Sequence, residues 1–123
     1  MTATATEMSE LEGALPAGAV VTDEAITEGY RRDWARDPNA GRPVAVVRAT
    51  CTADVQAVLG WASSHDVPVV PRGAGSGLSG GSSAVDGCIM LSLERMREVT
   101  VDVPTRVAVA QPGALNVEVK QAK

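Results

Sequence analysis

Residues 43–81 have the sequence "PVAVVRATCTADVQAVLGWASSHDVPVVPRGAGSGLSGG", which orders a strand, a helix, a second strand and a glycine-rich loop. The valine-rich run at 44–49 is typical of a buried strand, and a second such run lies at 67–71. Between them the chain has helical periodicity up to residue 64 or 65, with Thr52 as the expected cap. Because this connection is long enough for a crossover, the two strands are predicted to be parallel. The expected apolar face of the helix consists of Val55, Val58, Leu59 and Ala62.

Three segments are expected along the chain. Residues 1–22 begin with a polar, small-residue stretch that predicts a flexible N-terminal tail. Residues 23–41 are expected to form a helix and a loop, the helix running from Asp23, its N-cap, to about Trp34. Residues 42–123 then form one α/β unit.

The part of this unit after the glycine loop is predicted to contain more strands. The apolar run at 87–93 predicts a strand, and 93–102 predicts a turn of helix that passes into another. Residues 106–113 alternate with period two until a Pro-Gly pair ends the strand. The helical pattern at 114–123 has no glycine cap, which suggests a sequence truncated within a domain.

The composition restricts the class of protein. A chain of 123 residues, 45% hydrophobic and 21% charged, suits one modest globular domain. The net charge is −4 and the basic residues do not cluster, so nucleic-acid binding is not expected. The sequence contains neither a run of 18 apolar residues nor a basic stretch before an apolar one. We therefore expect a cytoplasmic protein without a transmembrane segment.

The cysteines and the histidine are expected to be structural. Cys51 and Cys88 are isolated from each other and from histidine, which favours two buried thiols and argues against a metal site. His65 ends the predicted helix, where an imidazole suits the helix dipole, so we do not expect it to be catalytic. A solvated helix face is also favoured over a site for the polar residues Tyr30, Arg31 and Asp33.

The glycine loop is the strongest functional signal, with five glycines between Gly73 and Gly81. Gly75, Gly77 and Gly80 have the G-x-G-x-x-G spacing of a dinucleotide fold, but no long helix follows them. A P-loop would require lysine where Gly81 stands. Two interpretations remain: a nest of amide groups around a diphosphate, or a surface loop without a ligand.

The order of these motifs resembles a known family. "YRRDW", "VPVVPRGAGSGLSGG", "LSLERM" and "QPG" are similar to FAD-linked oxidases with a PCMH-type (vanillyl-alcohol-oxidase-type) flavin domain. Among these oxidases, the chain is most similar to glycolate oxidase flavin subunits and D-lactate or D-2-hydroxyacid dehydrogenases. The resemblance implies an α+β (α/β) fold, namely the first subdomain of the flavin domain. Its small sheet would have a parallel βαβ start and flanking helices.

The resemblance also implies a cofactor site for FAD. Backbone amides would contact the FAD diphosphate, and the end of the loop would close over it. No histidine or cysteine lies between Arg72 and Asp86, so non-covalent FAD is expected. Ser76 stands where the family usually has threonine, and Ala49 where it has proline. The implied diphosphate contacts are Arg72, Gly73, Ala74, Gly75, Ser76 and Gly77; the closing residues are Leu78, Ser79 and Gly80; a turn near the flavin is Pro112 and Gly113.

The implied activity is flavin-dependent oxidation of a small D-2-hydroxy acid to a 2-oxo acid. The resemblance assigns no catalytic residue and no metal ligand to these 123 residues, because such groups lie in later parts of the family's chains. The second flavin subdomain and the substrate domain are the expected missing partners. The alternative function is a non-catalytic or remnant FAD-binding module, and a Rossmann-type NAD-binding domain is less favoured.

Overall fold

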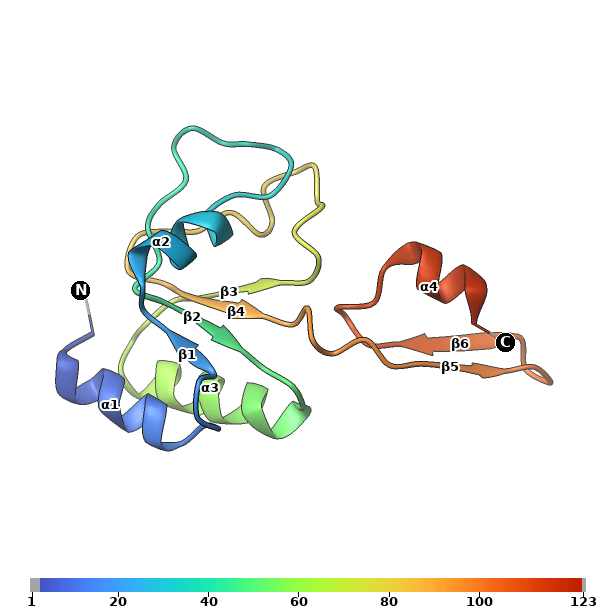
Figure 1. The fold of residues 1–123 in the computed structure, drawn as a ribbon, viewed down its shortest axis with the longest axis horizontal. Helices are drawn as coiled ribbons and strands as arrows, with labels where there is room; N and C mark the ends of the chain where they lie inside the picture. The colour runs from blue at the N-terminus through green and yellow to red at the C-terminus, as the bar shows by residue number, and fades with distance from the viewer. Residues whose placement is uncertain (1–2, 123) are drawn as a thin grey trace.

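The computed structural model describes residues 3–122. A four-stranded sheet with helices around it forms the larger part, and a two-stranded hairpin with a short helix extends away from it (Figure 1). None of the helices in the described part is long and apolar enough to cross a membrane.

The four-stranded sheet contains the predicted parallel unit. Strand β1 (Val20–Val21) pairs antiparallel with β2 (Ala45–Arg48), while β2 and β3 (Val69–Arg72) both run parallel to β4 (Ile89–Ser92). The order is β1-β2-β4-β3, so β4 lies between the two strands that the crossover helix connects. The strands predicted at 44–49, 67–71 and 87–93 are thus confirmed.

The crossover helix α3 (Thr52–Ser64) has a different start from the one predicted. Cys51 occupies the N-cap position without a side-chain hydrogen bond, and Thr52 is already helical. The start is fixed instead by Asp54, whose carboxylate accepts bonds from the Thr50 N–H at 3.0 Å and the Thr50 hydroxyl at 2.9 Å. The backbone bond from Thr50 lowers the pKa of Asp54.

The apolar face of α3 is rotated from the expected one. Val58, Trp61 and Ala62 are buried, whereas Leu59 remains 48% exposed. Trp61 takes the buried position because its indole N–H donates to the carbonyl oxygen of Glu7 at 2.8 Å. The helix that supplies this carbonyl was not expected.

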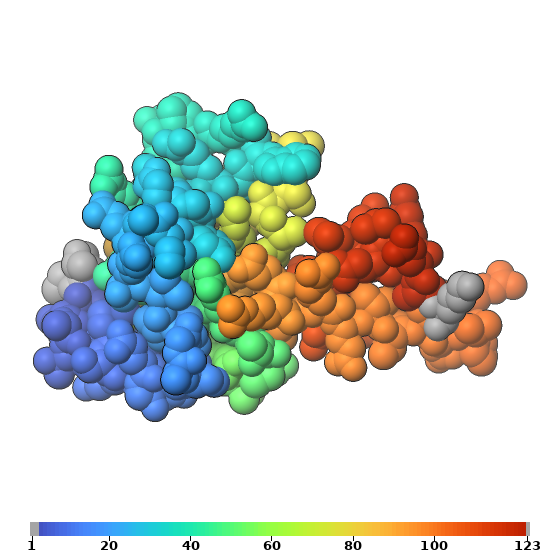
Figure 2. All heavy atoms as spheres, viewed as in Figure 1, coloured from blue at the N-terminus to red at the C-terminus, as the bar shows by residue number. Residues whose placement is uncertain are grey.

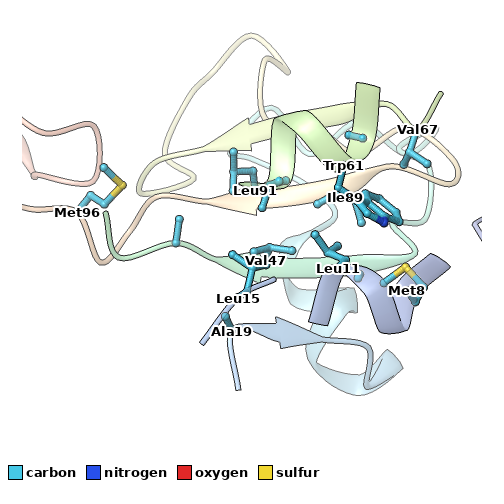
Figure 3. Close-up of a cluster of buried hydrophobic side chains, with 14 residues drawn as sticks. Met8, Leu11, Leu15, Ala19, Val47, Trp61, Val67, Ile89, Leu91 and Met96 are labelled. Atoms are coloured by element: carbon cyan, nitrogen blue, oxygen red, sulfur yellow. The ribbon is translucent and has the colours of Figure 1, made fainter. Parts of the chain in front are cut away.

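The predicted N-terminal tail is wrong. Residues Ala5–Gly13 form helix α1, which begins with a reciprocal capping box between Thr4 and Glu7. Met8 and Leu11 of this helix are buried against α3 and the sheet, as Figure 3 shows. The sequence does not predict this helix because most of its residues are small or polar. Its narrow apolar stripe is stabilised only by the apolar surface of the rest of the protein.

The sheet separates two apolar clusters. The larger cluster, drawn in Figure 3, lies on the side of α1 and α3 and includes Leu11, Val47 and Ile89. The smaller cluster lies on the opposite face around Val46 and Met90. The central strands β2 and β4 are therefore buried on both faces, which is why they are largely apolar in the sequence, whereas the edge strand β3 is only partly buried. Cys88 belongs to the smaller cluster, but Cys51 is exposed, so the prediction of two buried thiols is wrong for Cys51.

The helix predicted from Asp23 to Trp34 is much shorter. Helix α2 (Glu24–Thr27), capped by Asp23 as predicted, continues only into the 3-10 turn η1 (Glu28–Tyr30). Residues 31–34 are not helical, because their polar groups form hydrogen bonds with the glycine loop and the residues after it.

The extension consists of β5 (Val99–Asp102), β6 (Val107–Ala110) and helix α4 (Asn116–Gln121). The two strands are antiparallel, and every residue of β6 is exposed. In Figure 2 this part projects beyond the body of the molecule, in orange and red. An ion pair between Arg97 and Glu118 connects α4 to the segment before β5. The turn of helix predicted at 93–98 is absent: Leu93–Met96 forms one backbone-bonded turn instead.

Candidate cofactor-binding loop

The glycine loop lies at the carboxyl edge of the parallel strands. It leaves the end of β3, where Arg72 is in register with Ser92 of β4, and Ser92 is in register with Arg48 of β2. In open α/β sheets this edge is the usual place for a ligand, because each strand ends there and its connecting loop begins.

The backbone amides of the loop have no hydrogen-bond partner in the described part of the protein, and every residue of 73–81 except Gly75 is at least partly exposed. No described residue accepts a hydrogen bond from a backbone N–H of 73–81. The next amide along the chain, that of Ser82, donates to Asp33. The neighbouring loop at 31–42 is different, because eight of its amides, such as that of Trp34, are bonded within the protein. A run of free, adjacent amides is what an anion-binding nest requires.

The loop and the Pro-Gly turn meet at one point. A Cβ atom on Gly73 would lie 2.6 Å from the carbonyl oxygen of Pro112, and one on Gly113 would lie 2.1 Å from that of Leu93. Both approaches involve backbone atoms, so only glycine fits at either position. The residues expected near one cofactor, 73 and 112–113, are therefore brought together by the fold.

Two glycines of the loop have backbone angles that favour glycine. Gly75 has φ +72° and Gly80 has φ +81°, in the region that residues with a side chain rarely adopt. Together with the contact at Gly73, these angles explain why the segment is so rich in glycine. The glycines themselves add no side chains to the run of free amides, and this cradle of amides fits a diphosphate.

The side chain of Arg72 lies beneath the loop. Its guanidinium donates to the carbonyl oxygens of Arg32 at 2.8 Å and Tyr30 at 3.4 Å, and packs against Gly75. It also lies 5.4 Å from the centre of the Tyr30 ring, a cation–π contact. The guanidinium of Arg72 thus connects the loop to residues 30–32, and the backbone of Arg72 stands at the start of the loop.

The outer part of the loop is open to solvent. Ser76, Gly77 and Ser79 are exposed, and Leu78 is 75% exposed. The hydroxyl groups of Ser76 and Ser79 can therefore donate to a ligand beside the backbone amides, as the sequence suggests.

Two polar residues that were expected on a solvated face belong to this region. Asp33 is only 3% exposed, and its carboxylate accepts from the Ala35 amide at 2.9 Å and from the Ser82 amide at 3.4 Å. Tyr30 is half-buried and donates its hydroxyl to Glu94 at 2.6 Å; burial and this carboxylate raise its pKa. The helix predicted from Asp23 to Trp34 concealed the roles of both residues. Pro38 and Gly41, which follow Asp33 in the sequence, are nevertheless turn signals.

His65 is remote from the loop, at the C-terminus of α3. One ring nitrogen lies 2.8 Å from the carbonyl oxygen of Trp61, whose indole stacks on the imidazole, and the other lies 3.3 Å from Glu10. The predicted position at the end of the helix is confirmed, and the expected lack of a catalytic role stays a prediction.

Comparison with known proteins identifies the family. Residues 43–122 match the family model described as an FAD binding domain. The chain belongs to the FAD binding domain family. FAD is accordingly its cofactor, and the cradle of free amides and glycines described above fits the diphosphate of that molecule.

Relatives of this FAD binding domain include enzymes of hydroxy acids. A D-2-hydroxyglutarate dehydrogenase of Xanthomonas citri pv. viticola is 43% identical over 90 residues, which are 72% of the chain and 18% of the relative. A D-lactate dehydrogenase of Archaeoglobus fulgidus is 40% identical, covering 62% of the chain and 17% of the relative. A glycolate oxidase subunit of Bacillus subtilis is 31% identical, covering 70% and 22%. The chain thus spans about a fifth of the length of these relatives.

Solved structures share the fold of the FAD binding domain. Alkyldihydroxyacetonephosphate synthase superposes with a TM-score of 0.83 at 19% identity, over 98% of the chain and 24% of that structure. p-Cresol methylhydroxylase with substrate bound superposes with a TM-score of 0.77 at 21% identity, over 95% of the chain and 24% of that structure. The predicted PCMH-type fold is therefore confirmed.

Proposed function

We propose that this FAD binding domain serves an oxidoreductase that converts a small D-2-hydroxy acid, of the glycolate or D-lactate type, to the 2-oxo acid. The observation that carries the cofactor part is the run of free amides at 73–81, at the carboxyl edge of the sheet. The substrate part rests on the relatives, whose named substrates are all 2-hydroxy acids.

The proposed site is the glycine loop with the adjacent turn. The amides of residues 72–77 donate to the diphosphate, residues 78–80 close over it, and Pro112 and Gly113 border the flavin. Bound FAD supplies the oxidant for the α-carbon of the hydroxy acid. The residues described here bind and orient the cofactor. Binding is non-covalent, since 72–86 offers no histidine or cysteine, and a cytoplasmic location suits the unpaired thiols.

The test of cofactor binding is a titration of the chain with FAD, followed by flavin fluorescence. Gly80→Asp introduces a carboxylate into the loop, where only the Ser83 hydroxyl lies within 4 Å of the added Cβ, and is expected to abolish saturable binding by charge repulsion. Gly18→Asp is the matched control, because Gly18 also has a positive φ of +81° but lies before β1 with nothing within 4 Å of a Cβ. Equal binding by both variants would contradict the proposed site.

The substrate assignment requires a second measurement. The FAD-loaded protein, completed with the remaining domains of a relative where necessary, is mixed with D-lactate, glycolate or L-lactate without oxygen. Loss of the visible flavin absorbance with the first two acids only is the expected result. Reduction by none of them would contradict the proposed activity and leave FAD binding intact.

A module that binds FAD without catalysis of its own is the second candidate. It is favoured by the exposed strand β6, on which Val107 and Val109 are 50% and 65% exposed. The flavin reduction assay separates the two candidates.

A further inference from the structure

Residues 30–34, which we call the clasp, contact the glycine loop at four places. The Arg72 guanidinium donates to the Arg32 carbonyl oxygen at 2.8 Å. The Trp34 amide donates to the Gly77 carbonyl oxygen at 3.0 Å. The Ser82 amide donates to Asp33 at 3.4 Å, and the Ala84 amide to the Arg31 carbonyl oxygen at 2.8 Å. The clasp thus holds the start, the middle and the end of the loop.

These contacts leave the amides of 73–81 unbonded, because the two amides that they use, those of Ser82 and Ala84, follow the glycines. Between Arg72 and Ser82, the loop offers the clasp a carbonyl oxygen at Gly77 and keeps the amides of 73–81 unbonded. A loop held in this way is ordered before a ligand arrives, so less conformational entropy is lost when the ligand binds. The clasp therefore stabilises a conformation with its donors free.

Asp33 is the side chain on which the clasp depends. It is 3% exposed, and a Cβ atom on Gly77 would lie 3.4 Å from its Oδ2. Its Oδ1 holds the clasp's own turn through the Ala35 amide, and its Oδ2 faces the Ser82 amide. A single buried carboxylate thus links the two segments.

We propose that the clasp is part of the cofactor site, with Asp33 as the positioning residue that fixes the glycine loop in its diphosphate-binding conformation. The clasp lies before residue 43, where the match to the FAD binding domain begins. The inference rests on the proposed function for its cofactor and on the hydrogen bonds above for its geometry.

The test compares three variants of the full chain. Asp33→Ala removes both contacts of the carboxylate. Asp33→Asn retains one oxygen for the Ala35 amide but places an NH₂ group opposite Ser82, so it breaks the link and preserves the turn. Asp37→Ala is the matched control: Asp37 accepts from the Asn39 amide at 2.8 Å in the same kind of turn, but it is exposed and does not contact the loop.

Two readouts are measured for each variant. Without FAD, hydrogen exchange at the Ser82 amide is expected to accelerate about tenfold in both Asp33 variants, since a bond to a charged group is lost. With FAD, their dissociation constants are expected to rise by a similar factor, whereas Asp37→Ala retains the values of the unmodified chain.

The outcomes separate the clasp from the proposed function. Unchanged exchange in Asp33→Asn would overturn the clasp, whatever the FAD affinity. Faster exchange with an FAD affinity equal to that of Asp37→Ala would also overturn it, because the loop would then need no positioning. Faster exchange in a protein that never binds FAD would overturn the proposed function and support the clasp as the loop's anchor.

Discussion

At the scale of single residues, the glycines of this chain fall into two physical classes. Gly75 and Gly80 are required by their positive φ, whereas Gly73 and Gly113 are required by close contact with backbone carbonyl groups. The first class supports the curvature of the loop. The second brings the loop and the Pro-Gly turn together, so both contribute to the proposed FAD site.

Gly113→Ala is expected to destabilise the fold. The added Cβ would meet the Leu93 carbonyl oxygen and the backbone of Glu94, which cannot move without shifting the segment after β4. We expect a loss of about 1–3 kcal/mol in the free energy of unfolding, measured by urea denaturation. Gly60→Ala in α3 is the control, because nothing lies within 4 Å of its Cβ; alanine there should stabilise by about 0.5–1 kcal/mol. Equal effects would show that the contact at Gly113 relaxes freely.

At the scale of elements, the helices owe their positions to interactions across the chain. Helix α1 carries few apolar residues, but it is fixed by the capping box at Thr4 and by the Trp61–Glu7 bond to α3. The start of α3 is fixed by Asp54 rather than by its N-cap residue. Local sequence signals therefore locate these helices only in part.

The contribution of Asp54 is expected to depend on pH. Because the hydrogen bond from the Thr50 backbone holds the folded pKa of Asp54 below its ordinary value, the stabilisation is complete above that ordinary value and is lost as the pH falls through the folded pKa. Asp54→Ala should cost about 1 kcal/mol at neutral pH, as the loss of a helix cap does, and progressively less as the pH falls through the folded pKa of Asp54. Urea denaturation at several pH values measures this. A cost that is independent of pH, or one that the exposed Asp102→Ala shares, would contradict it.

At the scale of the whole molecule, the hairpin is the least self-contained part. Within residues 3–122, strands β5 and β6 pair only with each other, and Val107 and Val109 are exposed on alternate positions of β6. Figure 2 shows this part projecting from the body of the molecule. A contiguous exposed apolar strand favours association with other surfaces.

The chain is therefore expected to self-associate with increasing concentration. Replacing both Val107 and Val109 by Thr should shift the equilibrium toward the monomer, as measured by analytical ultracentrifugation. The control is Leu59→Thr, which removes a single exposed apolar side chain from α3. If the unmodified chain sediments as a monomer at all concentrations, the apolar face of β6 has no such role.

The sequence by itself determined the parallel βαβ unit, the order of the motifs and, through the family resemblance, FAD as the cofactor, whereas the glycine loop as its binding site stays a prediction. These features rest on local patterns: apolar runs buried on both faces of a sheet, helical spacing, and glycines in a fixed order. The hairpin strands and the Asp23 cap were predicted on the same grounds.

Only the tertiary structure decided how Asp33, Tyr30 and helix α1 are used. Asp33 and Ser82 are distant in the sequence. They meet because the chain passes the clasp on its way from β3 to β4, which lies between β2 and β3 in the sheet. Helix α1 is stable because Met8 and Leu11 find an apolar surface on α3 and the sheet. Burial and long-range hydrogen bonds depend on where distant segments meet, and periodicity within one segment does not contain that information.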